Sequence, residues 1–191
     1  MISFIIINIG QMFRKIINFL NSMYVRIIIS GKSHSLRCHF PIKINNPQMI
    51  SIGKNVRIYE NVWLNCYKNK KNKINLTIDD NVSIGRFSQI NAWEDVVIKK
   101  NVLISENVYI SDVSHNYFKK NIKTKFTKPK KILINDNVWL GRNVMILPGV
   151  IIGSNSVVSA NSLVNKSIPS NCIVAGNPAK IVKKISKKKL R

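Results

Sequence analysis

The chain of 191 residues is poor in acidic residues, cysteine and histidine, and each shortage excludes a class of protein. Its three cysteines, Cys38, Cys66 and Cys172, are an odd number at unrelated spacings, which argues against a disulfide framework and favours reduced thiols in the cytoplasm. Only one of its three histidines lies beyond residue 39, and a catalytic zinc commonly needs three protein ligands. We therefore expect no metal.

Negative charge is the scarcest property of the chain. Lys and Arg number 31 against 8 acidic residues, which gives a formal net charge of +23. Such a surface attracts phosphate-bearing ligands or anionic membranes. The sequence contains no basic helix with interleaved aromatics, no ribonucleoprotein signature and no Cys/His finger, so we expect no nucleic-acid partner. A compositional bias toward Asn, Ile and Lys explains the charge equally well.

The first 49 residues are expected to form a helical lead-in segment that does not cross a membrane. Asn8, Gly10 and Arg14 interrupt the apolar run, leaving it too short to span a bilayer. Its positive charges follow the apolar residues and no cleavage site is evident, so it does not resemble a signal peptide. The favoured interpretation is a helix packed on the body of the domain or on a neighbouring subunit. The alternative is an interfacial helix that contacts the inner face of the membrane peripherally.

From residue 50 onward one aliphatic residue recurs every six positions. The fifteen positions are Ile52, Ile58, Leu64, Ile78, Ile84, Ile90, Ile98, Ile104, Ile110, Ile134, Leu140, Ile146, Ile152, Val158 and Val164. The residue two places earlier is aliphatic in twelve of them, the exceptions being Ser88, Ser156 and Ser162. A period of two within each repeat indicates short strands with one buried face, which a helical period of 3.6 cannot produce.

Asn marks the turns between these repeats. It stands three places after the aliphatic residue in nine of the fifteen repeats: Asn55, Asn61, Asn81, Asn101, Asn107, Asn137, Asn143, Asn155 and Asn161. Asn tolerates the left-handed backbone conformation of a tight corner. With three repeats to a coil, the pattern predicts an all-β parallel β-helix of about five coils over residues 50–183. Polar excursions interrupt it at residues 68–75 and, as a longer basic loop, at 116–131, and a basic tail follows at 184–191.

Three stretches of the sequence resemble one known family. ISDVSHNY (110–117), NVWLGRNVMILPGVIIGSNSVVSANSLV (137–164) and IPSNCIVAGNPAKIV (168–182), in this order, are similar to the hexapeptide-repeat acyltransferases, among them the galactoside, maltose and surface-polysaccharide O-acetyltransferases. The resemblance implies that the helix is left-handed, that the protein is a homotrimer, and that it moves acetyl from acetyl-CoA to a hydroxyl of a sugar, in a bacterial surface polysaccharide or its precursor.

His115 is the candidate general base that this resemblance implies. Family members place a single His just past the end of a coil, before the extended loop, where it removes the proton of the acceptor hydroxyl. An imidazole suits this role because its pKa lies near neutrality. Many polysaccharide-modifying relatives carry Asp-His-X-His here, whereas this chain has Asp112-Val113-Ser114-His115, which leaves one candidate base.

The resemblance also assigns residues to the two substrates. Those that match the family's acetyl-CoA groove, which lies between neighbouring subunits of a trimer, are Trp139, Gly141, Arg142, Ser159, Ala160, Asn165, Lys166, Lys180 and Lys183. Within this set Trp139 is expected to wall the acyl end, and the lysines to meet the nucleotide and its phosphates. Asn91, Trp93 and Asp112 lie on coils near His115 and are candidates for binding the sugar.

Three other functions remain open on the same scaffold. One is N-acetylation of an amino sugar, free or nucleotide-linked, which needs the same base and cofactor. Another is acetylation of an antibiotic hydroxyl. The third is a non-catalytic interaction platform, which predicts no acetyl-CoA binding and no effect of removing His115.

Overall fold

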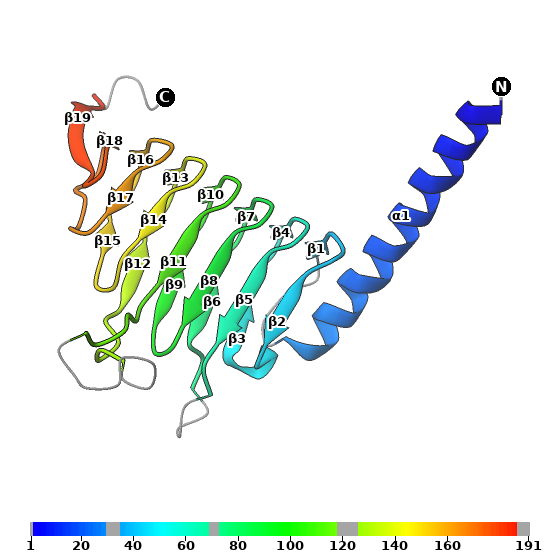
Figure 1. Cartoon of the computed structure of the whole chain (residues 1–191), viewed down its shortest axis with the longest axis horizontal. Coiled ribbons are helices and arrows are strands. Elements are labelled where there is room, and N and C mark those ends of the chain that lie inside the picture. The colour runs from blue at the N-terminus through cyan, green and yellow to red at the C-terminus, as the bar shows by residue number, and fades with distance from the viewer. Residues whose placement is uncertain (1, 30–34, 69–72, 118–125, 187–191) are drawn as a thin grey trace.

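The computed structural model shows a three-sided prism of parallel strands with one long helix projecting from its first coil (Figure 1). It describes residues 2–29, 35–68, 73–117 and 126–186, with only the backbone for residues 2–10. Residues 118–125 of the expected loop and 187–191 of the basic tail therefore lie outside the described residues. Each side of the prism is one sheet, and every strand except the terminal, antiparallel β19 pairs with the strand one coil away.

The strands fall into three sheets. Sheet 1 contains β1 (Arg37–Cys38), β4 (Arg57–Ile58), β7 (Ser83–Ile84), β10 (Leu103–Ile104), β13 (Trp139–Leu140), β16 (Val157–Val158), β18 (Cys172–Ala175) and the antiparallel β19 (Lys180–Lys184). Sheet 2 contains β2 (Lys43–Asn45), β5 (Trp63–Cys66), β8 (Gln89–Ala92), β11 (Tyr109–Ser111), β14 (Met145–Ile146) and β17 (Leu163–Val164). Sheet 3 contains β3 (Ile50–Ile52), β6 (Leu76–Ile78), β9 (Val96–Ile98), β12 (Ile132–Ile134) and β15 (Ile151–Ile152).

The prism begins earlier than residue 50, where the sequence pattern begins. β1 pairs with β4 and β2 pairs with β5, and both precede the short 3-10 helix at Pro47–Met49. Five complete coils therefore run from β1 to β15, β16 and β17 form a sixth with the bridge at Ile168, and β18 begins the next. The first coil escapes the sequence pattern because Cys38 stands at its first aliphatic position and because the step from Ile44 to Ile52 is eight residues long instead of six.

The six-residue pattern is confirmed as the core of the prism. All fifteen aliphatic positions are at most 1% exposed. Ser88, Ser156 and Ser162, the three exceptions two places earlier, are equally buried, and each hydroxyl is hydrogen-bonded to a backbone group. Buried polar groups of this kind cost stability only when they lack a partner. The core thus accepts serine because the adjacent corner backbone supplies that partner.

The corner asparagines have the left-handed backbone that the sequence predicts. All nine have φ between 56 and 61°. Their side chains also hydrogen-bond from coil to coil, and the longest ladder runs through Asn55, Asn81, Asn101, Asn137, Asn155 and Asn171 with N–O distances of 3.0 to 3.2 Å. Each corner therefore stabilises the next one as well as turning the chain.

The helix α1 (Ile2–Ile28) joins the prism through its C-terminal half. Val25 and Ile29 are buried against the first coil, and Arg14 pairs with Glu60, which also contacts Arg86 at 3.1 Å. Burial acts to raise the pKa of Glu60, but hydrogen bonds and these guanidinium groups hold it below its usual range. The contacts of the Glu60 carboxylate therefore stabilise the folded protein at neutral pH, and this contribution is lost as the pH falls through the lowered pKa of Glu60. No described helix is long and apolar enough to cross a membrane.

Candidate active site

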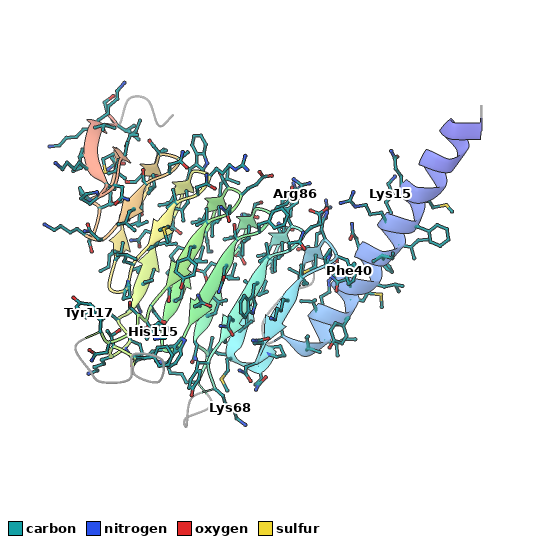
Figure 2. All side chains as sticks on the ribbon, viewed as in Figure 1. Lys15, Phe40, Lys68, Arg86, His115 and Tyr117 are labelled. Atoms are coloured by element: carbon teal, nitrogen blue, oxygen red, sulfur yellow. The ribbon has the colours of Figure 1, made fainter. Side chains whose placement is uncertain are left out.

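His115 lies on the edge of the prism between sheets 2 and 3, where the chain leaves β11 (Figure 2). Its backbone forms an isolated antiparallel bridge with Phe126, which closes the base of the loop, and Thr127 donates its N–H to the carbonyl of Ser114 at 2.8 Å. The imidazole is therefore held on a clamped loop base. It borders a cavity of about 300 Å³ that opens on this edge.

Aromatic rings form one wall of this cavity. The ring centroids of His115 and Phe126 lie 4.5 Å apart, those of Phe126 and Trp93 4.5 Å, and those of Trp93 and Tyr67 4.1 Å, with the last pair stacked within 7°. Tyr67, Trp93 and His115 come from three successive coils at the same edge, and Phe126 comes from the base of the loop that follows His115. Such a wall suits the apolar face of a sugar ring.

Two of the three candidate sugar-binding residues, Asn91 and Trp93, line the cavity with His115. The side-chain oxygen of Asn91 accepts hydrogen bonds from Asn65 and Gln89, each at 3.0 Å. This leaves its amide nitrogen as the group that can donate to a sugar hydroxyl. The cavity thus combines an imidazole, an amide and an aromatic wall.

Asp112, the third candidate, does not line the cavity. It is fully buried, and its carboxylate accepts the backbone N–H groups of Trp93, Glu94 and Asp95 at 2.8 to 3.0 Å. Burial raises the pKa of Asp112, and these hydrogen bonds act in the opposite direction. The sequence does not reveal these hydrogen bonds, because their donors lie on the adjacent coil. Asp112 therefore fixes the turn that presents Trp93.

Replacing Asp112 with Asn is expected to destabilise the protein by about 1–3 kcal/mol, because an amide NH₂ cannot accept the N–H groups now bonded to one carboxylate oxygen. Urea unfolding at pH 7 measures the loss. Asp136→Asn is the matched control, since Asp136 accepts one N–H, from Lys100 at 3.0 Å, at an exposed corner. Unchanged stability with a raised KM for the sugar would instead make Asp112 a substrate ligand.

The residues predicted to bind acetyl-CoA divide between separate parts of one chain. Gly141, Arg142, Ser159 and Ala160 lie on the edge between sheets 1 and 2, next to Trp139 on sheet 1. Asn165 and Lys166 lie instead on the His115 edge, two coils above it. Lys180 and Lys183 are exposed on the terminal strand β19. A single chain therefore does not bring the predicted cofactor residues together.

A second hollow, of about 550 Å³, lies beside the edge between sheets 1 and 2. Arg142 lines it together with Tyr59, Arg86 and Ser105, and the indole N–H of Trp139 donates to the hydroxyl of Ser105 at 2.9 Å. On the same edge, Gly141 packs closely against the coil that contains Ala160. Only glycine fits at this position, because an added Cβ would lie 2.6 Å from the backbone nitrogen of Ala160.

Sequence reasoning missed several residues around the His115 cavity. Tyr109, Phe126, Leu147 and Pro148 line it, and Tyr67 extends its aromatic wall. Phe126 could have been suspected from the sequence, because it is an aromatic residue in an otherwise basic loop. The others look like ordinary repeat positions. Among the described residues no cluster of three His, Cys, Asp or Glu side chains could hold a metal ion.

Comparison with known proteins defines the class to which this fold and site belong. Residues 131–166 match the model of the family described as bacterial transferase hexapeptide, six repeats. The chain is 36% identical over 154 residues to WbbJ of Escherichia coli K12, which is assigned as a lipopolysaccharide biosynthesis O-acetyl transferase, and the match covers 76% of each chain. It is 34% identical to the galactoside O-acetyltransferase of the same organism, covering 75% of this chain and 61% of that enzyme.

Solved structures agree with this classification. An N-acyltransferase from Bacillus cereus, in complex with dTDP-4-amino-4,6-dideoxyglucose and coenzyme A, superposes with a TM-score of 0.75 at 21% identity over 89% of this chain and 91% of that one. A hexapeptide-repeat acetyltransferase from Vibrio cholerae in complex with acetyl coenzyme A gives 0.60 at 26% identity, covering 85% and 75%.

The chain belongs to the hexapeptide-repeat acetyltransferase family and is an acyltransferase. The predicted left-handed parallel β-helix is confirmed.

Proposed function

We propose that this protein transfers acetyl from acetyl-CoA to a hydroxyl of a sugar in a bacterial surface polysaccharide or its precursor, with His115 as the general base. The observation that carries the proposal is the position of the imidazole at a cavity walled by Trp93 and Phe126 and equipped with the amide of Asn91. The similarity to WbbJ, with its assignment to lipopolysaccharide biosynthesis, supports a surface-polysaccharide acceptor.

His115 would accept the proton of the sugar hydroxyl as its oxygen attacks the thioester carbonyl carbon. The C–S bond then breaks, the acetyl ester remains on the sugar, and the imidazolium returns its proton to the departing thiolate. A hydroxyl is a weak nucleophile at neutral pH, so deprotonation during attack lowers the barrier. The mechanism needs no covalent intermediate on the protein and no metal.

We further propose that the working unit is a homotrimer. Six of the nine predicted cofactor residues lie on two edges of one prism, and a groove between two copies would bring the His115 edge of one against the Gly141 and Ala160 edge of the next. Closed threefold assembly repeats that contact at every interface. The three buried, unpaired cysteines suit a reducing compartment, which supports a cytoplasmic location.

The direct test is release of free coenzyme A from acetyl-CoA in the presence of a panel of bacterial surface sugars. The proposal expects turnover with hydroxyl acceptors and an ester product that mild alkali hydrolyses. An alkali-stable amide, formed only with amino sugars, would favour N-acetylation instead. Failure of acetyl-CoA to bind would support a non-catalytic platform.

Replacing Lys166, Lys180 and Lys183 with Gln is expected to raise the KM for acetyl-CoA and to weaken its salt dependence, while kcat at saturation changes little. Exposed ammonium groups attract phosphates, and salt screens that attraction within about 8 to 10 Å. Steady-state kinetics at two ionic strengths measure both effects. Lys54, Lys99 and Lys100 offer an equal charge change on the edge between sheets 3 and 1, and an equal rise in KM from those substitutions would refute a local role.

A further inference from the structure

The helix α1 presents its polar stripe to its own prism. Four residues spaced four apart make these polar contacts: Arg14, Asn18, Ser22 and Arg26. The side-chain oxygen of Asn18 accepts the N–H of Phe40 at 2.8 Å, and the hydroxyl of Ser22 accepts the N–H of Cys38 at 2.8 Å. A helix that packs on a globular core ordinarily directs its apolar side inward. In α1 the polar side faces the prism and most of the apolar side chains face away from it.

Over residues 12–27 the outward side of α1 is apolar, and the described part of the chain leaves it uncovered. Nine large apolar side chains are 44–79% exposed: Met12, Phe13, Ile16, Ile17, Phe19, Leu20, Met23, Tyr24 and Ile27. At 100° per residue they occupy an arc of about 160°, and no charged residue falls within it. A helix seam that pairs with one partner helix is narrower than this. The width of the arc therefore favours a broad apolar surface as the partner.

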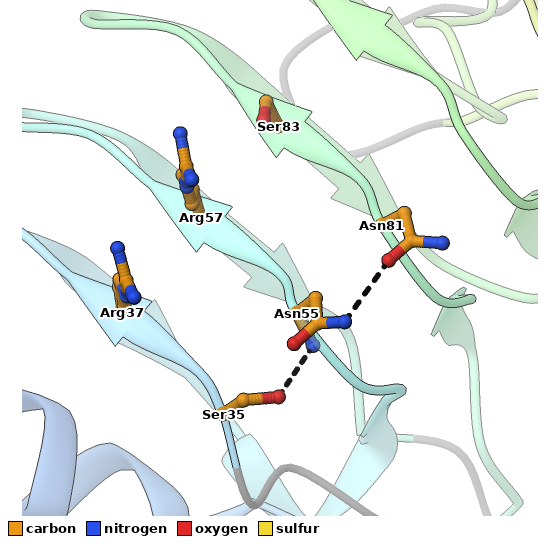
Figure 3. A pocket seen from close by; sticks show the side chains of 6 residues that line it. All are labelled: Ser35, Arg37, Asn55, Arg57, Asn81 and Ser83. Atoms are coloured by element: carbon orange, nitrogen blue, oxygen red, sulfur yellow. Dashed lines mark hydrogen bonds between the residues drawn. The ribbon is translucent and has the colours of Figure 1, made fainter.

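Cations lie along one margin of this arc. Lys15 and Arg26 border it on the helix, and a groove of about 320 Å³ between α1 and β1 joins them to Arg37. Arg57 is paired in register with Arg37 on the next coil, and the two side chains project in the same direction (Figure 3). Among the described residues, their adjoining pocket, of about 400 Å³, is otherwise lined by Ser and Asn.

Arg37 and Arg57 form no ion pair with an acidic residue of the described chain. All eight acidic residues of the chain lie in the described part, and none forms an ion pair with Lys15, Arg37 or Arg57 there. Two guanidinium groups on adjacent strands repel each other unless an anion lies between or beside them. A phosphate oxygen is a strong acceptor for guanidinium donors. This pocket is thus suited to a phosphate group.

We propose that α1 lies in the surface of an anionic phospholipid bilayer, with its apolar arc among the acyl chains and with Lys15, Arg37 and Arg57 on the headgroup phosphates. An interfacial helix combines a wide apolar face with flanking cations in this way. The net charge of +23 adds long-range attraction to an anionic surface. The polar contacts to Phe40 and Cys38 hold the helix with that face outward. The proposal is independent of the acetyl-transfer chemistry.

The test is cosedimentation of the full-length protein with vesicles of phosphatidylglycerol mixed with phosphatidylcholine and with vesicles of phosphatidylcholine alone. The protein is expected to bind the anionic vesicles more tightly, and less so at high salt. The double variant Arg37→Gln, Arg57→Gln should lower the partition coefficient about 30-fold, since each cation near an anionic surface contributes about fivefold. Leu20→Asp with Ile27→Asp should lower it at least about tenfold.

Two controls separate this proposal from its rivals. Lys100→Gln with Lys184→Gln removes the same charge away from α1 and should retain binding within about threefold. Ile181→Asp places an acidic group on an exposed apolar site of β19 and should also retain it. Circular dichroism verifies that every variant is folded.

Absence of vesicle binding by the folded wild-type protein would overturn the proposal. A smaller assembly in sedimentation for Leu20→Asp with Ile27→Asp, with vesicle binding unchanged, would show that a second copy covers the arc and would also overturn it. Loss of binding in the charge control equal to that in the arginine variant would refute the phosphate contacts.

Discussion

His115→Ala is expected to lower kcat by about two to four orders of magnitude, the usual range for loss of a positioned general base, while the affinity for acetyl-CoA changes little. The imidazole borders the acceptor cavity, whereas most of the residues predicted to hold the coenzyme lie on other parts of the prism. Release of coenzyme A at saturating substrates measures kcat, and calorimetric titration of the variant with acetyl-CoA measures affinity.

The control for His115→Ala is His39→Ala. His39 stacks on Tyr59 near the first coil, away from the cavity, and its replacement should leave kcat unchanged. Stability of both variants is compared by urea unfolding, because His115 also packs on Phe126. Wild-type turnover in a folded His115→Ala protein would refute His115 as the general base and would show that another group accepts the proton.

Coexpression of two inactive variants is expected to restore activity if the site forms between copies. Ala160→Trp should block the groove from the edge between sheets 1 and 2, where Ala160 is exposed, and His115→Ala removes the base from the other edge. Random mixing in a trimer leaves both half-sites intact at about one interface in four, so activity should recover to about a quarter of wild type. Each variant expressed alone should show a small fraction of the activity recovered in the mixture.

Differently tagged subunits allow the mixed trimers to be purified and assayed. The same two substitutions placed in one chain, mixed with wild-type chains, provide the control with an equal number of mutated residues. No recovery in purified mixed trimers would mean that each chain contains its own complete site. A monodisperse, active monomer in sedimentation would refute the trimer itself.

The sequence determined the core of this protein with little help from the fold. Each coil is built from residues close in the chain, so one buried aliphatic residue per six positions defines the strands directly. Asn specifies the corners for a local reason, because its backbone conformation at φ near 60° depends mainly on the residue itself. His115 was found from its motif, and the structure places it at a cavity, where its catalytic role stays a prediction.

The arrangement of the other site residues depends on contacts between coils. These contacts join residues that are separated in the sequence by no constant number of positions. Asp112 and Trp93 are 19 residues apart, and only the stacking of one coil on another shows that the carboxylate holds the turn of the tryptophan. The aromatic wall joins Tyr67 to Phe126 for the same reason.

Sequence alone gave the N-terminal segment its helical character and its excess of apolar residues. It did not give the orientation of α1, which the tertiary structure decided through hydrogen bonds that Asn18 and Ser22 accept from backbone N–H groups of the first coil. Periodicity assigns residues to opposite sides of a helix but does not say which side faces the protein. That choice depends on the partner's surface, and here unsatisfied backbone N–H groups of the first coil select the polar side.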